Sequence, residues 1–425
     1  MVSVEVKRSN ISGTVTCPPS KSYTHRAIAI ASLTDGESTV TNALLARDTL
    51  ATINACKKLG SQLAQNNKTI TILGRSKFDA GNREIDAANS GTTIRIMIAM
   101  SALVEDGKTT LTGDESLNKR PMQPLLDALK RLGVDSTSTN GMPPVVVKGG
   151  GIRGGHTEIS GDVSSQFISA LLISCIYADK DVEISVKGEQ VSKPYIDSTL
   201  ATMQRFGVKI QDDYYTNYRV KCQQYKPAKF DVPSDFSSAA MMLAAGALAG
   251  EVAVNGLNFE LPQADAKIID ILHDMGAHVK MDRGKGVVRV EAPDRLEGDR
   301  FNLHNTPDLL PVVSVLALKA KNKVTINGVA HARVKETDRI TNIARELKKF
   351  GAEVEEFEDG LSIQVLDKLK NARLNAYNDH RLFMAFCIAS LLTERCIIDG
   401  LESVDVSYPA FVDDLQKLGA SINGS

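Results

Sequence analysis

A phrase that occurs six times constrains the fold of this 425-residue chain more than any other feature. In each copy an amphipathic helical stretch, often with a basic last turn, runs into a glycine, and a β-favouring run follows. These glycines lie 68–75 residues apart, at Gly60, Gly133, Gly207, Gly276, Gly351 and Gly419. Glycine commonly ends a helix in the left-handed conformation. The spacing therefore predicts six structural units of one design.

A second phrase recurs in step with the first, and it consists of a polar head followed by an Ala-, Leu- and Ile-rich stretch. Its six copies are SKSYTHRAIAIASL, NSGTTIRIMIAMSAL, SSQFISALLISCI, SSAAMMLAAGAL, PDLLPVVSVLALKA and NDHRLFMAFCIASLL. Helices that are apolar on nearly every side belong in the interior of a protein. Each unit should therefore hold one buried helix, one surface helix and several short strands.

The size and number of the units favour an α/β protein of two domains with three repeats each. A TIM barrel needs eight shorter units, and solenoid repeats are usually about 20–45 residues long. The middle of the chain carries a proline in the run 231–234, where the repeat pattern breaks. The run 17–20 holds Pro-Pro, which forms a stiff extended link, and it is a candidate for a second crossing between the domains.

Charge and cysteine content exclude several classes of function. The chain has 50 Lys and Arg against 51 Asp and Glu, so a nucleic-acid or membrane surface has no general electrostatic attraction for it. Its six cysteines form no C-x-x-C pair, which favours free thiols in a reducing compartment. No apolar stretch reaches the ~20 residues of a membrane span, and the start lacks a signal sequence. We expect a cytoplasmic protein with no metal and no cofactor.

Cations occur in or near the polar heads, where the helix dipole disfavours them. They are Lys21, Arg26, Arg120, Lys335, Arg339 and Arg381. A bound phosphate or carboxylate at the helix N-termini would compensate this charge. The pattern therefore indicates a small substrate with more than one negative charge. The Ser, Asn and Asp residues of the heads have a simpler interpretation as N-caps, which remains open for each of them.

Two carboxylates stand among these cations and are candidates for proton transfer. Glu336 lies in the run Lys-Glu-Thr-Asp-Arg at 335–339, and Asp308 follows Thr-Pro at the fifth head. The alternatives are structural: Asp308 can serve as an acid at the start of a helix, and the 335–339 run can be a solvated first turn.

Seven motifs, in order and spread over nearly the whole chain, resemble the 5-enolpyruvylshikimate-3-phosphate synthase family. They are PSKSYTHRA, NSGTTIR, KRPM, GDVSSQF, TPDLLP, RVKETDR and NDHR. The resemblance implies a fold of six βαβαββ repeats in two domains. One domain would be discontinuous and carry both termini (1–18 plus 233–425), and the other would span 19–232, with the active site in the cleft between them.

The resemblance also implies a reaction, which is the transfer of the enolpyruvyl group of phosphoenolpyruvate to the 5-hydroxyl of shikimate 3-phosphate with release of phosphate. That step belongs to the synthesis of chorismate and aromatic amino acids. By motif, the shikimate 3-phosphate ligands would be Lys21, Ser22, Arg26, Ser164, Ser165, Gln166, Ser192, Tyr195, Asp308 and Lys335. The phosphoenolpyruvate ligands would be Lys21, Asn89, Gly91, Arg120, Gln166, Arg339 and Arg381.

The family pattern assigns the proton transfers as well. Asp308 would accept the proton of the attacking hydroxyl, Glu336 would protonate the methylene carbon, and Lys21 would shuttle a proton at the bridging or leaving oxygen. The sequence departs from the family in three places: Ile96 replaces a proline, His331 replaces an asparagine and Val406 replaces a lysine that contacts phosphoenolpyruvate.

Two alternatives compete with the resemblance to this family. A UDP-N-acetylglucosamine enolpyruvyl transferase should carry Lys-Asn in place of Lys21-Ser22 and a cysteine in the loop of Arg120, and the chain has neither. A non-catalytic anion-binding scaffold made of repeats would not need charges confined to the repeat heads. We expect the protein to be a monomer.

Overall fold

The computed structural model describes residues 2–424, and the chain divides into two compact units. One is the continuous stretch Pro19–Pro233, and the other joins the segment up to Pro18 with the segment from Ser234 onward. The sequence-based division places residue 233 with the terminal segments. The observed boundary falls one residue later, and the Pro233 carbonyl accepts a 2.7 Å hydrogen bond from the amide of Ser20 in the continuous unit.

The continuous unit contains three four-stranded sheets with one pairing pattern: two adjacent parallel strands, then an antiparallel hairpin. The sheets, in spatial order, are β14 (Lys229–Asp231), β3 (Gly36–Thr41), β5 (Thr69–Gly74), β4 (Gln62–Asn66); β6 (Arg83–Asp86), β7 (Lys108–Thr112), β9 (Met142–Lys148), β8 (Ser136–Thr139); and β10 (Gly155–Ser160), β11 (Val182–Lys187), β13 (Asn217–Val220), β12 (Gln211–Asp213).

The unit with the terminal segments has three sheets of the same pattern. They are β2 (Ile11–Thr16), β15 (Gly250–Asn255), β17 (Val287–Glu291), β16 (His278–Asp282); β18 (Arg300–Asn302), β19 (Val324–Asn327), β21 (Gly360–Gln364), β20 (Glu353–Phe357); and β22 (Arg373–Asn375), β23 (Arg395–Asp399), β1 (Ser3–Lys7), β24 (Ser421–Gly424). The first and third of these sheets each take a strand from the N-terminal segment.

Two series of helices complete the six βαβαββ repeats. The predicted buried series is α1 (Lys21–Ser32), α3 (Gly91–Ser101), α5 (Ser165–Cys175), α7 (Phe236–Ala249), α9 (Leu310–Leu316) and α11 (His380–Ser390). The predicted surface series is α2 (Arg47–Leu59), α4 (Gln123–Arg131), α6 (Lys193–Arg205), α8 (Ile268–Asp274), α10 (Arg339–Lys349) and α12 (Phe411–Lys417). Short 3-10 turns are η1 (Leu117–Lys119), η2 (Ala264–Lys267), η3 (Pro307–Leu309), η4 (Ala317–Lys319), η5 (Ala330–Val334) and η6 (Leu401–Val406).

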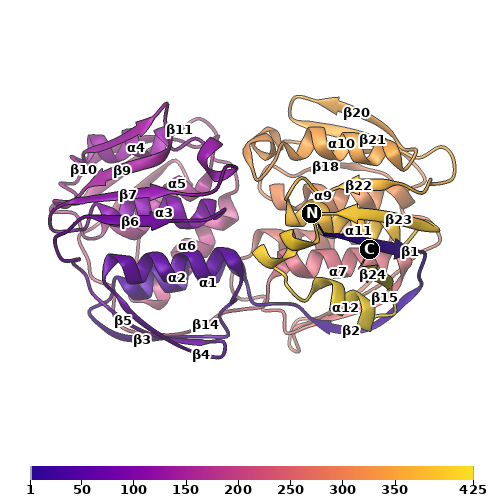
Figure 1. The fold of residues 1–425 in the computed structure, drawn as a ribbon, viewed down its shortest axis with the longest axis horizontal. Helices are drawn as coiled ribbons and strands as arrows, with labels where there is room; N and C mark the ends of the chain where they lie inside the picture. The colour runs from indigo at the N-terminus through magenta and orange to yellow at the C-terminus, as the bar shows by residue number, and fades with distance from the viewer. Residues whose placement is uncertain (1, 425) are drawn as a thin grey trace. The chain divides into compact units, whose positions relative to one another are not determined.

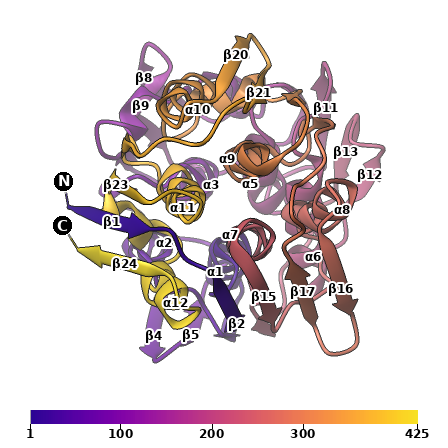
Figure 2. The same ribbon diagram turned by 90° about the vertical axis from the view of Figure 1, so that its right-hand side faces the viewer.

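The buried helices pack against one another in the centre of each unit. Helix α3 packs on α5, and α11 packs on both α7 and α9. Figure 2 shows α7, α9 and α11 in the middle of their unit with the sheets around them. Nearly every residue of α7 is buried, because its Ala, Met and Leu side chains face neighbours on all sides. Within residues 2–424, no helix is both long enough and apolar enough to cross a membrane.

The repeat glycines have the backbone geometry that the sequence predicts. All six have positive φ, between 79° and 118°, and follow the surface helices. That conformation costs glycine little and lets each helix stop before the next strand. The fifth buried helix is shorter than predicted, since the run 307–319 is split into η3, α9 and η4. Pro311 lies in the first turn of α9. It has no amide hydrogen to donate, so it is tolerated at the start of a helix but not in its interior.

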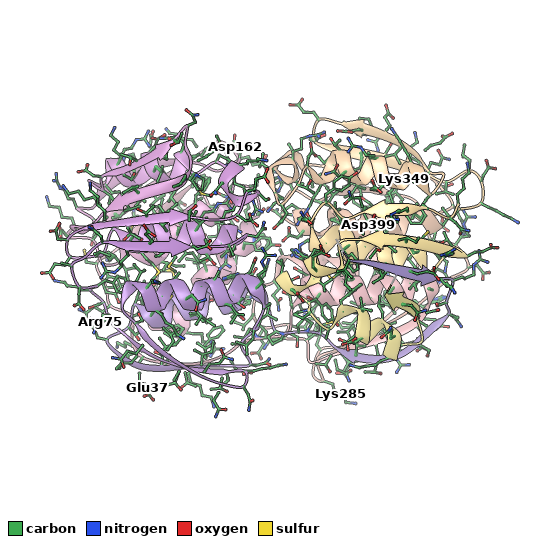
Figure 3. All side chains as sticks on the ribbon, in the orientation of Figure 1. Glu37, Arg75, Asp162, Lys285, Lys349 and Asp399 are labelled. Carbon is green, nitrogen blue, oxygen red and sulfur yellow. The ribbon has the colours of Figure 1, made fainter. Side chains whose placement is uncertain are left out.

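Charged side chains are unevenly distributed between surface and interior. Figure 1 shows the sheets on the outside of each unit, and charged residues such as Glu37 and Lys285 project from them in Figure 3. A smaller set of charges is buried near the N-terminal ends of helices, and these include Arg26 in α1, Arg339 in α10 and Asp379 at the cap of α11. Burying a charge is costly unless it is paired, so this second set needs explanation.

Candidate functional site

Five of the six buried helices begin at a side-chain N-cap, and the exception is the fifth, where neither η3 nor α9 has one. Side chains of Ser20, Ser90, Ser164, Asp235 and Asp379 each accept a hydrogen bond from a backbone amide two or three residues ahead. Asp338 caps the surface helix α10 in the same way. Capping accounts for these residues alone. Other side chains in or near the same first turns carry buried charges, and capping does not explain them.

In the unit with the termini, Arg339 is the centre of a network of carboxylates. Its side chain is 1% exposed and begins α10. Its Nε and Nη atoms donate to Asp379 at 2.7 Å, to Asp308 at 2.8 Å and to Glu336 at 2.7 Å. These partners come from three segments of two repeats, namely η3 and the loop before α10 in the fifth and the cap of α11 in the sixth. The structure therefore brings together both predicted proton-transfer residues and one predicted phosphoenolpyruvate ligand.

Arg381 joins the same network from the first turn of α11. It donates from Nη2 to Asp308 Oδ2 at 2.9 Å, and its Nη1 lies 3.9 Å from Asp265 Oδ2. Asp308 thus bridges two arginines, one with each carboxylate oxygen. Charge-assisted bonds of this kind are about twice as strong as neutral ones.

The pKa values of the two aspartates next to Arg381 are shifted in opposite directions. Burial would raise the pKa of Asp308, but Arg381, Lys335 and Arg339 outweigh it and hold this pKa well below its ordinary value. Burial and the charge of Asp308 raise the pKa of Asp265 to about 7. One cluster therefore contains a strongly ionised carboxylate beside a carboxyl group that titrates near neutrality.

Lys335 lies on the loop between η5 and α10, and His331 precedes it on η5. His331 is 8% exposed, and its ring packs edge-on against that of His304, with 6.1 Å between the ring centroids. Burial, together with Lys335 and His304, lowers the pKa of His331 to about 3. His331 is therefore a neutral ring at physiological pH. Val406, where the family has lysine, ends η6 and is 5% exposed.

In the continuous unit, Arg26 joins α1 to α6. Its guanidinium donates to Thr199 Oγ1 at 2.7 Å, to the Ser22 carbonyl at 2.9 Å and to the Tyr195 carbonyl at 3.0 Å. Burial lowers the pKa of Arg26 to about 10, which leaves it charged. Ser192 immediately precedes α6 with a φ of 57°, a left-handed conformation that is uncommon outside glycine. The predicted residues Ser22, Arg26, Ser192 and Tyr195 thus form one local group.

A second group in the continuous unit surrounds the first turn of α3. Arg95 Nη1 donates to Gln166 Oε1 at 2.5 Å, and Arg120 Nη2 donates to Asn89 Oδ1 at 3.0 Å. A Cβ atom on Gly91 would lie 3.1 Å from a guanidinium nitrogen of each of these arginines. Any larger residue would therefore crowd the two cations, which explains a glycine at this helix start. The group also includes Ser164, the α5 cap, and Ser165 beside it.

Lys21 does not contact either of these groups through a described hydrogen bond. It begins α1, and its Nζ donates to Asp48 Oδ2 at 2.9 Å, with the lysine side chain 16% exposed. Asp48 lies in the first turn of α2 and is itself buried. The ammonium group is thus held in place by an acid on the neighbouring surface helix.

Sequence reasoning missed four residues of these networks as members of a site: Asp48, Arg95, Asp265 and Asp379. Arg95 and Asp379 lie inside the motifs NSGTTIR and NDHR, so the motifs held a signal for them. Asp48 and Asp265 lie outside the heads of the buried helices, and only the tertiary structure reveals their partners. Among residues 2–424, no group of three or more His, Cys, Asp and Glu side chains is arranged to hold a metal ion.

Side chains of these kinds are able to bind an anion and to transfer protons. In water-poor surroundings, arginines and lysines at helix N-termini stabilise phosphate and carboxylate groups. Asp308 and Glu336 stand in direct contact with Arg339, so an anion bound there would lie close to both carboxylates.

Comparison with known proteins shows similarity to one enzyme family along nearly the whole chain. The profile of the family described as EPSP synthase (3-phosphoshikimate 1-carboxyvinyltransferase) matches residues 6–415. A protein of Nitrosopumilus maritimus named 3-phosphoshikimate 1-carboxyvinyltransferase is 49% identical over 98% of this chain and 99% of its own length. A protein of the same name from Methanococcus vannielii is 41% identical, with 98% and 99% coverage.

Solved structures show the same similarity in three dimensions. The structure of EPSP synthase from Acinetobacter baumannii has a TM-score of 0.82 at 26% identity and covers all of both chains. The enolpyruvyl transferase NikO from Streptomyces tendae has a TM-score of 0.79 at 16% identity, covering 100% of this chain and 99% of its own. At 16% identity, the match to NikO supports only the assignment of the fold.

Proposed function

The chain belongs to the EPSP synthase (3-phosphoshikimate 1-carboxyvinyltransferase) family, and from this we propose that the helix-end charges described above are its active-site residues. The reaction transfers the enolpyruvyl group of phosphoenolpyruvate to the 5-hydroxyl of shikimate 3-phosphate and releases phosphate. One observation carries the assignment: Arg339 contacts Asp308 and Glu336 directly, and Arg381 contacts Asp308. The groups required to bind an anion and to move protons are thus linked by hydrogen bonds.

We propose that shikimate 3-phosphate is bound by the residues that the family motifs assign to it. Arg26 and the serines at the starts of α5 and α6 provide cationic and hydroxyl donors suited to a phosphate and to ring hydroxyls. The full set is Lys21, Ser22, Arg26, Ser164, Ser165, Gln166, Ser192, Tyr195, Asp308 and Lys335.

Phosphoenolpyruvate, in this proposal, binds where cations gather most densely. The pair Arg95 and Arg120 beside Gly91 supports this assignment in the continuous unit. The proposed contacts are Lys21, Asn89, Gly91, Arg120, Gln166, Arg339 and Arg381. We add Arg95 to this set, because it shares the Gly91 position with Arg120 and donates to Gln166.

The proton transfers are assigned to Asp308 as base, Glu336 as acid at the methylene carbon and Lys21 at the bridging or leaving oxygen. The low pKa of Asp308 makes it a weak base while both arginines pair with it. A phosphoenolpyruvate anion on Arg339 and Arg381 would offset their positive charge. The pKa of Asp308 should then rise toward a value suited to general-base catalysis, so binding of the second substrate switches the base on.

The decisive experiment measures phosphate release by the purified protein with both substrates. We expect release only when shikimate 3-phosphate and phosphoenolpyruvate are both present, and calorimetry should show binding of shikimate 3-phosphate by itself. UDP-N-acetylglucosamine as the acceptor is the matched control. Phosphate release with that acceptor, and none with shikimate 3-phosphate, would support the alternative transferase and reject the proposal.

We also propose that the protein is a cytoplasmic monomer that needs no cofactor. All six cysteines are free thiols, as expected in a reducing compartment. Light scattering coupled to size exclusion would measure the mass of the species in solution against the 45.9 kDa of one chain. A mass twice that value would contradict the monomer.

A further inference from the structure

Asp265 is a buried acid for which the motifs and the proposed reaction have no role. It lies on η2 and is 2% exposed. Its neighbour Ser237 begins the fourth polar head, SSAAMMLAAGAL, which contains no charged residue. The pair thus comes from the one repeat that supplies none of the proposed active-site residues.

The geometry around Asp265 places Arg381 between two carboxylates. Asp308 on η3 accepts from Arg381 Nη2 at 2.9 Å, and Asp265 Oδ2 lies 3.9 Å from Nη1 on the other arm. The hydroxyl of Ser237, in the first turn of α7, donates to the same Asp265 oxygen. Three elements from two repeats, η2 and α7 of the fourth and η3 of the fifth, therefore surround the Arg381 guanidinium.

The η2 segment itself is anchored to the start of α7. The side chain of Gln263, two residues before Asp265, accepts from the Phe236 amide at 3.0 Å and donates to the Ser234 carbonyl at 2.9 Å. These two bonds connect the segment that carries Asp265 to the start of α7.

We propose that Asp265, oriented by Ser237, is a positioning residue that holds one arm of the Arg381 guanidinium for phosphoenolpyruvate. The proposal rests on the proposed role of Arg381 as a ligand of that substrate. Of the two acids beside the Arg381 guanidinium, only Asp308 would remain if Asp265 were removed. Arg381 would then turn toward Asp308 and present itself less well to an incoming anion. A displacement of about 1 Å at a reacting group can cost up to ~10²-fold in rate.

The pKa of Asp265 gives a way to distinguish a positioning role from a stabilising one. Burial, Asp308 and Asp235 raise its pKa, whereas Arg381 and Ser237 lower it, and the result is a pKa of about 7. In the unfolded chain Asp265 has the ordinary pKa of an aspartate. The folded state therefore loses stability as the pH rises from that pKa toward 7. A neutral side chain here should leave the protein at least as stable at pH 8.

The test compares Asp265→Asn and Ser237→Ala with the control Asp270→Asn, an acid on α8 whose side chain is 63% exposed. For Asp265→Asn we expect KM for phosphoenolpyruvate to rise about tenfold or more. The affinity for shikimate 3-phosphate should stay within about twofold of wild type, and Tm at pH 8 should not fall. Ser237→Ala should raise the same KM by a smaller factor, and the control should change nothing.

Arg381→Lys distinguishes a failure of this proposal from a failure of its premise. If Arg381→Lys raises KM for phosphoenolpyruvate and Asp265→Asn leaves it within about twofold, Asp265 has no positioning role. If neither variant raises it, the role of Arg381 is wrong and the Asp265 proposal falls with it. If Asp265→Asn lowers Tm at pH 8 and weakens both substrates equally, Asp265 is structural and the proposal is overturned. Should Asp265→Asn not fold, an unchanged KM in Ser237→Ala overturns it.

Discussion

Arg339 is a buried cation that contacts more acids than it can neutralise. Three carboxylates surround one guanidinium, and Asp308 also pairs with Arg381. Such a cluster holds its cations in position without a ligand, and it presents an incoming anion with arginines that are already oriented. In the proposed site these arginines are therefore largely oriented in advance, and the substrate would compete with Asp308 and Glu336 for the same donors.

Removing the charge of either proposed proton-transfer residue should affect turnover more than binding. Asp308→Asn and Glu336→Gln keep the side-chain shape, and each should lower kcat by about 10²-fold or more. Phosphoenolpyruvate should bind at least as well to Asp308→Asn, because both arginines lose a competing carboxylate. Steady-state kinetics would measure both effects. Glu353→Gln on the exposed strand β20 is the control, and near-normal kcat in either active-site variant would remove that residue from the mechanism.

At the scale of elements, the sequence specified which helices are buried and where they begin. The repeated heads became the N-termini of α1, α3, α5, α7 and α11, and the repeat glycines ended the surface helices. The sequence could not specify which charges meet. Arg339 and Asp379 lie 40 positions apart, and Arg381 and Asp308 lie 73 apart, so only packing of one repeat on another determines these contacts.

Asp379 has two functions at the start of α11 that can be measured separately. It caps the helix through the amides of Arg381 and Leu382, and it pairs with Arg339. Asp379→Asn should keep the cap and lose the ion pair, which should cost about 3 kcal/mol because both partners are buried. Asp379→Ala should lose about 0.5–2 kcal/mol more for the cap. Urea denaturation would give both values, and equal stability of the two variants would show that the cap contributes nothing.

The whole molecule is built from two units whose chain connectivity differs. The unit 19–233 is a single stretch, whereas the other borrows β1 and β2 from residues before the first crossing. Strand β1 pairs with both β23 and β24, and β2 pairs with β15. Proline interrupts the repeat pattern in the runs 17–20 and 231–234, and on that ground the sequence predicts a crossing in each run.

This difference predicts unequal behaviour of the two halves. The fragment 19–233 should fold alone and unfold cooperatively, whereas 234–425 should not, because two of its sheets lack a strand. Addition of a peptide of residues 2–18 should restore a cooperative transition to 234–425, as followed by circular dichroism. A peptide with Val4→Asp and Val6→Asp is the control, since both valines are buried in the sheet. Cooperative unfolding of 234–425 without any peptide would contradict the prediction.

The position of strands β1 and β24 has a further consequence. They are antiparallel neighbours, with Val4 opposite Gly424, in the place that a connected hairpin occupies in the other five sheets. Figures 1 and 2 mark both ends of the chain beside this sheet. Splicing these two strands together would complete the sixth hairpin and leave a cyclic backbone. In such a ring all six repeats have the same connectivity within their hairpins, and the opening between β24 and β1 is only one of several places where the circle could be cut.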